Sequence, residues 1–209
     1  MKTKLFILQV LFVTCTLSSF AQKPKPVFSI SAGISNAMYF TDDDYGEDNS
    51  SDIMVGPMAG VTYRIPFSKG WAVQPGLFYV QKGGVEDLSG YGESVKFKTS
   101  LNYLEMPLDI YYSKRNRFFF GFGPSFGLGL SGKMKAEGES EKISFGSGEE
   151  NDLKSFEVGI DLLGGFQFKN NLFIAVNINT GLNNLATDDT YKYMNGYMGI
   201  RLGYVFAGN

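Results

Sequence analysis

The stretch that decides the fold is Arg117 to Ser131, RFFFGFGPSFGLGLS. Its even positions are large and apolar apart from one proline (Phe118, Phe120, Phe122, Pro124, Phe126, Leu128 and Leu130), and its odd positions from 121 to 131 are all glycine or serine. A strict period of two indicates a β-strand whose successive side chains point to opposite faces. The small face suits a crowded, narrow lumen, so the large face must contact an apolar medium, which we interpret as lipid.

Seven other segments alternate in the same way: Val27–Phe40, Ile53–Ile65, Trp71–Lys82, Thr99–Tyr112, Ser155–Phe168, Leu172–Leu182 and Asn195–Phe206. Long polar connections (41–52, 84–98, 132–154, 183–194) alternate with short turns (66–70, 113–116, 169–171). This order is typical of outer-membrane barrels, which have short periplasmic turns and long outer loops. The sequence therefore predicts an all-β fold: an eight-stranded antiparallel up-and-down transmembrane β-barrel with four long extracellular loops and three short periplasmic turns.

Aromatic residues recur at the short-turn end of these segments, at the outward position nearest the turn. They are Phe28, Tyr63, Trp71, Tyr112, Phe118, Phe168, Tyr204 and Phe206. Aromatic rings prefer the headgroup level of a membrane. We interpret the set as a periplasmic aromatic girdle, which makes outer-membrane lipid an expected partner.

The N-terminus has the features of a signal peptide. Two lysines precede a short apolar run, and small residues at 19 and 21 allow cleavage before Gln22. The run is shorter than the roughly 20 residues a membrane-spanning helix needs, so we prefer cleavage to a membrane anchor. Lipidation at Cys15 is disfavoured because Thr14 precedes it. We expect a cleaved signal peptide over 1–21, a periplasmic leader over 22–26 and the barrel domain over 27–209, exported to the bacterial outer membrane.

The composition argues against several kinds of chemistry. The chain has no histidine, and its one cysteine would leave with the signal peptide. Catalysis by a histidine base, thiol chemistry and His/Cys zinc sites are therefore not expected. A paired-carboxylate glycosidase would need a cleft, which a filled lumen does not offer. The net charge of −2 provides no electrostatic footprint for nucleic acid. We expect no enzyme and no cofactor.

Charged residues of both signs occur at inward positions. We predict a polar network in the lumen from Arg64, Glu105, Asp109, Glu157, Asp161 and Arg201. Buried charges must be paired, so we expect the two arginines to bridge Glu105, Asp109 and Asp161. The alternative is a conduction path or a ligand site, although an eight-stranded lumen is too narrow for a wide pore.

The outer loops are the other candidate sites. Asp42, Asp43, Asp44, Glu47 and Asp48 crowd the first loop and are weak calcium candidates. Their spacing does not match the twelve-residue calcium loop, so a solvated acidic loop is preferred and no metal is predicted. The loop over 132–154 is rich in Gly, Ser, Glu and Lys, which suggests mobility, and such loops carry binding in adhesins and receptors.

Several segments resemble the PorT-like outer-membrane β-barrel family. They are YLEMPLDIYY (103–112), QPGLFYVQKGG (74–84) and DLLGGFQF (161–168). The resemblance implies an eight-stranded integral outer-membrane protein, and the family's namesake is associated with a secretion system. Proline removes a ladder donor from a strand, so Pro107 predicts a bulge or a local bend.

The expected role is structural or interactional: envelope integrity, adhesion, or an accessory part of protein secretion. Other envelope or secretion proteins would bind through the outer loops. The alternative is a soluble secreted or periplasmic barrel that binds a small hydrophobic ligand. That alternative requires apolar residues inside the barrel and polar residues outside.

Overall fold

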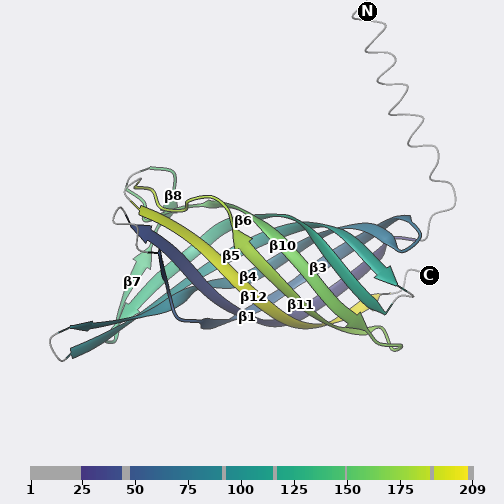
Figure 1. Ribbon diagram of the computed structural model, residues 1–209, viewed down its shortest axis with the longest axis horizontal. Coiled ribbons are helices and arrows are strands. Elements are labelled where there is room, and N and C mark those ends of the chain that lie inside the picture. The colour runs from purple at the N-terminus through teal and green to yellow at the C-terminus, as the bar shows by residue number, and fades with distance from the viewer. Residues whose placement is uncertain are drawn as a thin grey trace, which may run out of the picture.

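The computed structural model describes residues 25–43, 48–90, 93–114, 117–148, 150–188 and 191–206. The predicted signal peptide and the first residues of the leader lie outside this part of the chain. Eight long strands form the body (Figure 1): β1 (Val27–Asp43), β3 (Met54–Ser68), β4 (Trp71–Gly90), β5 (Glu93–Lys114), β6 (Phe118–Ala136), β10 (Phe156–Gln167), β11 (Leu172–Gly181) and β12 (Tyr191–Phe206). Four short strands accompany them: β2 (Asp48–Ser50), β7 (Glu139–Ile143), β8 (Phe145–Gly146) and β9 (Leu153–Lys154).

The eight long strands close into a ring. Their order is β1-β3-β4-β5-β6-β10-β11-β12, and β12 returns to β1 with pairs that run from Phe28↔Phe206 to Asp43↔Tyr191. All eight pairings are antiparallel. Every strand of the ring therefore has two neighbours, which is the condition for crossing lipid without an open sheet edge. The predicted eight-stranded antiparallel barrel is confirmed.

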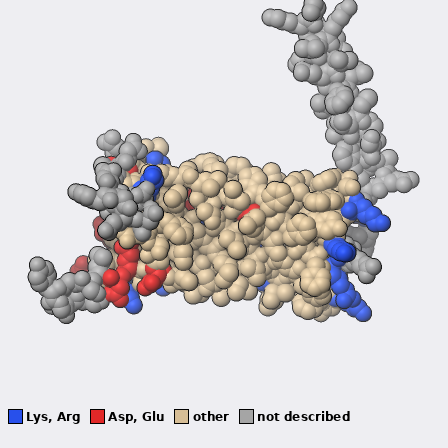
Figure 2. All heavy atoms as spheres, viewed as in Figure 1, with Lys and Arg blue, Asp and Glu red and all other residues tan. Residues whose placement is uncertain are grey.

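The predicted alternation decides which side chains face outward. Along β6, Phe118, Phe120 and Phe122 are exposed, while Phe119 and Gly121, which alternate with them, are buried. A Cβ placed on Gly123 would clash with the backbone carbonyl oxygen of Leu108 on β5, so only glycine fits this close approach. Figure 2 shows a broad surface that is almost free of charged side chains between two charged ends. The described residues contain no long apolar helix that could cross a membrane.

The bulge predicted at Pro107 of β5 and the inward position predicted for Ser131 of β6 are wrong, while no observation tests a local bend at Pro107. The register with β6 runs unchanged through Pro107↔Ser125, so Pro107 makes no bulge. The register shift lies instead at Asn102/Tyr103, opposite Leu130. This shift reverses which residues of β6 face outward. The sequence pattern placed Ser131 in the lumen, but Ser131 is exposed. Its hydroxyl accepts a hydrogen bond from Asn102 Nδ2 at 2.9 Å.

Two of the predicted long loops contain much strand. β4 and β5 continue to Gly90 and from Glu93, so most of 84–98 is a hairpin. β6 continues to Ala136 and turns into β7, which covers part of 132–154. A strand needs only about 9–11 residues to cross a bilayer, so β4, β5 and β6, with 20, 22 and 19 residues, project beyond it. We call this projection, made of 85–90, 93–99, 132–136 and β7, the outer sheet.

Candidate functional site

The interior of the barrel is filled in layers. An aromatic and aliphatic layer lies at the short-turn end and contains Ala72, Tyr111, Phe119, Leu163, Phe173, Ala175 and Val205. A second apolar layer lies toward the long loops and contains Tyr39, Leu101, Tyr103, Leu153, Leu185, Ala186 and Tyr193. Charged and polar side chains lie between the two layers, beside Ala37, Met58, Phe78, Val80 and Tyr197. Each of these clusters consists of buried side chains from several strands.

Lys82 is the centre of the buried polar network. Its Nζ lies 2.7 Å from Glu105 Oε2 and 2.8 Å from Glu157 Oε1, and all three side chains are almost fully buried. Tyr197 donates from its hydroxyl to Glu105 Oε1 at 2.5 Å, and Asn195 Nδ2 donates to Glu157 Oε2 at 3.1 Å. Four strands thus supply one bonded cluster to the middle of the lumen. Sequence reasoning omitted Lys82 from the network, although its inward position on β4 was a usable signal.

The predicted role of the arginines needs correction. Within the described residues, neither arginine has a carboxylate oxygen at ion-pair distance. The guanidinium of Arg64 lies 3.9 Å from the Tyr111 ring centre and donates to Gln74, while that of Arg201 lies 4.4 Å from the Phe78 ring centre. Arg201 does interact electrostatically with Asp161, Asp109 and Glu105, whereas the electrostatic partner of Arg64 is Tyr111. Stacking on rings holds each planar guanidinium in a way that inward parity alone does not reveal, although the buried Nε of Arg201 has no hydrogen-bond partner among the described residues.

The six predicted lumen residues therefore lie inside the barrel but divide into groups. Glu105 and Glu157 share Lys82, and Asp161 Oδ1 accepts a hydrogen bond from Asn177 Nδ2 at 3.1 Å. Counting Lys82, the set contains three cations and four carboxylates, and Arg64 is the cation that lies apart on Tyr111. A cavity of 10 Å³ lies beside Arg64 and Arg201, about the volume that one water needs. The described interior therefore combines buried charged, polar and aromatic side chains.

The predicted girdle residues lie at the short-turn end of the outer surface. Phe28 contacts Phe206 with ring centres 5.8 Å apart, and Trp71 contacts Tyr112 at 4.8 Å. Phe118 has the largest exposed fraction, 71%, and Tyr112 is the most covered of the set. Several of these rings contact one another along the rim, and their role as a headgroup-level girdle stays a prediction.

The acidic calcium candidates of the first loop have side chains outside the described residues. Within the described part of the chain, no group of three His, Cys, Asp or Glu residues is placed to hold a metal ion. The backbone of Asp42 pairs with that of Asp48 where β1 meets β2.

The outer sheet has two chemically different faces. Residues directly opposite on paired strands share a face. Lys96, Lys98, Lys133, Lys135 and Lys142 occupy one face, where Lys98 lies opposite Lys135 and Lys133 opposite Lys142. Asp87 forms an ion pair of 3.7 Å with Lys96 on the same face. Among the described residues, the other four lysines form no ion pair, so this face is strongly cationic.

The opposite face of the outer sheet forms a groove with a volume of 600 Å³. Its floor is apolar and half-buried: Val95, Phe97, Met134 and Ala136. Its border carries Glu137, Glu139 and Glu141. Among the described residues, β7 pairs with β6 alone, so its other edge is free. We call this surface the acidic groove.

The sequence model of the family described as "Outer membrane protein beta-barrel domain" matches residues 20–187 of the chain. No curated protein matches the sequence.

Among solved structures, Neisserial surface protein A (NspA) is similar with a TM-score of 0.57 at 12% identity, over 88% of this chain and 100% of that one. Ail, the attachment invasion locus protein of Yersinia pestis, is similar with a TM-score of 0.42 at 17% identity, over 88% of this chain and 100% of that one. The likeness to the neisserial protein concerns the fold.

Proposed function

Because the chain belongs to the outer-membrane β-barrel domain family, we propose that it is a non-catalytic, non-conducting integral membrane protein whose outer sheet binds another envelope or secretion protein. The acidic groove is the observation that carries this proposal. An apolar strip outside the lipid-facing band contributes nothing to membrane insertion, and contiguous exposed apolar surface of this kind marks interaction sites.

The chemistry of the groove indicates the kind of partner. Phe97 and Met134 offer apolar contact area, and Glu139 and Glu141 line the border. Carboxylates beside an apolar floor favour a cationic segment that also has apolar side chains. The free edge of β7 adds backbone donors and acceptors, to which an extended segment can pair.

The filled lumen supports the non-conducting part of the proposal. Two apolar layers and a bonded charge cluster occupy the axis, and eight strands leave little room beyond side chains. The soluble alternative is disfavoured, since it required an apolar interior. Here Lys82, Glu105 and Glu157 are inside, and large apolar side chains such as Leu202, at 65% exposure, are outside.

The orientation and the finer family assignment are part of the same proposal. The short turns and the described chain ends would face the periplasm, after export directed by a signal peptide over 1–21. The resemblance of YLEMPLDIYY to PorT-like barrels supports secretion as the setting, with adhesion as the rival interaction role.

The experiment places a photo-crosslinking amino acid at position 97, in the floor of the groove, or at position 135 on the lysine face. We expect a discrete crosslinked partner from position 97, and its loss when Glu139→Gln and Glu141→Gln are combined. The double variant Lys133→Gln/Lys135→Gln serves as the matched control and should leave the product intact. Equal products from both positions, or none from 97, would refute the assignment of the groove.

Conductance tests the other half of the proposal. The full chain in a planar bilayer should show no stable channel steps. Reproducible open channels from the purified protein would mean that the lumen layers move aside, and the plug interpretation would fail.

A further inference from the structure

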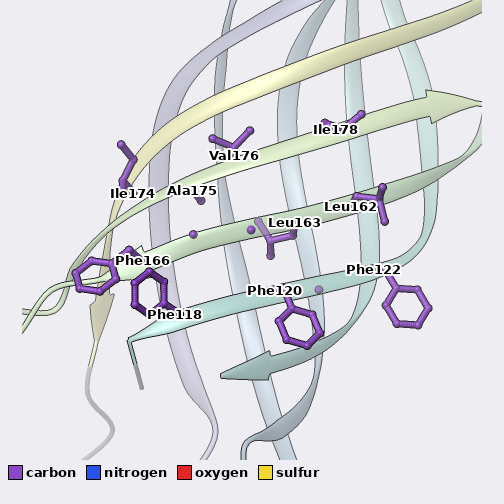
Figure 3. Close-up of a pocket in the computed structure, with 13 residues that line it drawn as sticks. Phe118, Phe120, Phe122, Leu162, Leu163, Phe166, Ile174, Ala175, Val176 and Ile178 are labelled. Carbon is purple, nitrogen blue, oxygen red and sulfur yellow. The ribbon is translucent and has the colours of Figure 1, made fainter. Parts of the chain in front are cut away.

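A second groove lies on the outer surface of the barrel, across β6, β10 and β11 (Figure 3). It has a volume of 740 Å³, within the range of about 300–1,000 Å³ for ligand sites. Phe118, Phe120 and Phe122 border it on one side, and Ile174 and Val176 on the other. Its position among outward side chains of the apolar band places it against lipid.

The groove exists because β10 lacks one outward side chain. Gly164 has the outward parity between Leu162 and Phe166, and it pairs with Phe120 on β6 and Val176 on β11. A Cβ on Gly164 would meet no atom within 4 Å, so the space above it is open. The neighbouring strands supply the walls, and the missing side chain leaves a channel between them.

The short-turn end of the groove is cationic. Arg117 precedes Phe118, Lys114 pairs with Phe118 across β5–β6, and Lys169 follows the end of β10. All three are exposed, and within the described chain none makes an ion pair. In the described turns and adjoining strand ends, every charged side chain is a lysine or an arginine, and Figure 2 shows cations gathered at this end.

We propose that this groove is a binding site for one phospholipid of the adjoining leaflet. An acyl chain lies over Gly164 between the phenylalanine and aliphatic walls, and the phosphate lies at the headgroup level against Arg117, Lys114 and Lys169. Aromatic residues such as Phe118 mark that level, so cations just beyond them are at the depth of the phosphate. An apolar channel that ends in unpaired cations matches the two parts of an anionic lipid.

A second copy of the chain is a poorer occupant. A two-fold contact would bring the same concave patch of each copy together, and two facing grooves would leave a void. This site is separate from the acidic groove of the outer sheet, so either proposal can fail alone.

The test uses the full chain in nanodiscs of phosphatidylethanolamine and phosphatidylglycerol. A trace of the phosphatidylglycerol carries a diazirine in one acyl chain as the photo-crosslinking probe. After photolysis, labelled peptides of β10 are compared with those of β3 on another part of the barrel. Gly164→Leu fills the groove without an interior clash, and Ala59→Leu adds the same side chain to β3 as the matched control. Heat-dependent gel mobility establishes that each variant is folded.

We expect β10 to be labelled at least about fivefold above β3, and Gly164→Leu, but not Ala59→Leu, to abolish the difference. Each cation near a membrane surface contributes about a fivefold preference for anionic lipid. Arg117→Gln/Lys169→Gln should therefore lower β10 labelling by phosphatidylglycerol and leave labelling by a diazirine diacylglycerol unchanged. Uniform labelling around the barrel, or an unaffected Gly164→Leu, would overturn the site. Crosslinked dimers lost on Gly164→Leu would instead assign the groove to a second copy.

Discussion

Replacing Lys82 with methionine tests whether its two ion pairs hold the interior together. Methionine keeps most of the volume but leaves Glu105 and Glu157 without their shared cation. At the observed separations of 2.7 and 2.8 Å, Coulomb's law with an effective dielectric constant of about 20 gives about 6 kcal/mol of attraction for each pair. Burial of three charged groups offsets most of that attraction in the intact cluster. Removal of one partner instead leaves buried charge unpaired, which costs about 3–5 kcal/mol.

The assay is reversible urea unfolding of the barrel in lipid vesicles. Trp71, the one tryptophan of the chain, lies 37% exposed in the girdle and reports release from lipid through its fluorescence. We expect Lys82→Met to lower the free energy of unfolding by about 3–5 kcal/mol. Lys69→Met, an exposed change in a turn, should stay within about 0.5 kcal/mol of the parent.

A triple variant separates charge from packing. Combining Lys82→Met with Glu105→Gln and Glu157→Gln removes the uncompensated charge, and the donors from Tyr197 and Asn195 can still bond to the amide oxygens. Most of the lost stability should return, since buried ion pairs can often be replaced by neutral groups at little cost. A loss below about 1 kcal/mol for Lys82→Met, or a triple variant as unstable as the single one, would refute the reasoning.

Three further changes test the surface and the strand contacts. Ile160→Arg, near the middle of the apolar band, should lower the free energy of unfolding in the vesicle assay by about 2–4 kcal/mol. Leu128→Arg, nearer the long-loop edge, should lower it by less. Equal losses would contradict the assigned depth of the two residues. Lys135→Glu should stabilise the outer sheet by about 0.2–1 kcal/mol, because Lys98 lies directly opposite. The gain should appear as slower amide hydrogen exchange in β5, and unchanged exchange would contradict it. Gly123→Ala should prevent the heat-dependent mobility shift because a Cβ would clash with the carbonyl of the adjacent strand; a normally folded variant would show that β5 and β6 can separate there.

The sequence was sufficient for the features that depend on alternation along one strand. The period of two in 117–131 predicted a strand with one glycine face, and β6 places Gly121 and Gly123 inward as expected. The same parity correctly placed Glu105 and Asp161 inside the barrel. It failed beyond Leu130, where an extra residue in β6 reverses the faces and moves Ser131 outward. A bulge changes the period without leaving a mark in composition, so parity cannot be carried across it.

What the sequence determined alone was the class of fold and the face of the side chains along each regular stretch of strand, because these follow from the local geometry of a strand. The tertiary structure decided which side chains of different strands meet, and at which level along the barrel axis. The relative stagger of eight strands brought Lys82 of β4 to Glu157 of β10 and set Arg201 on the ring of Phe78. It also set Gly164 between Phe120 and Val176, which opened the lipid-facing groove. Stagger is a property of the closed barrel as a whole, and no single segment of the chain contains it.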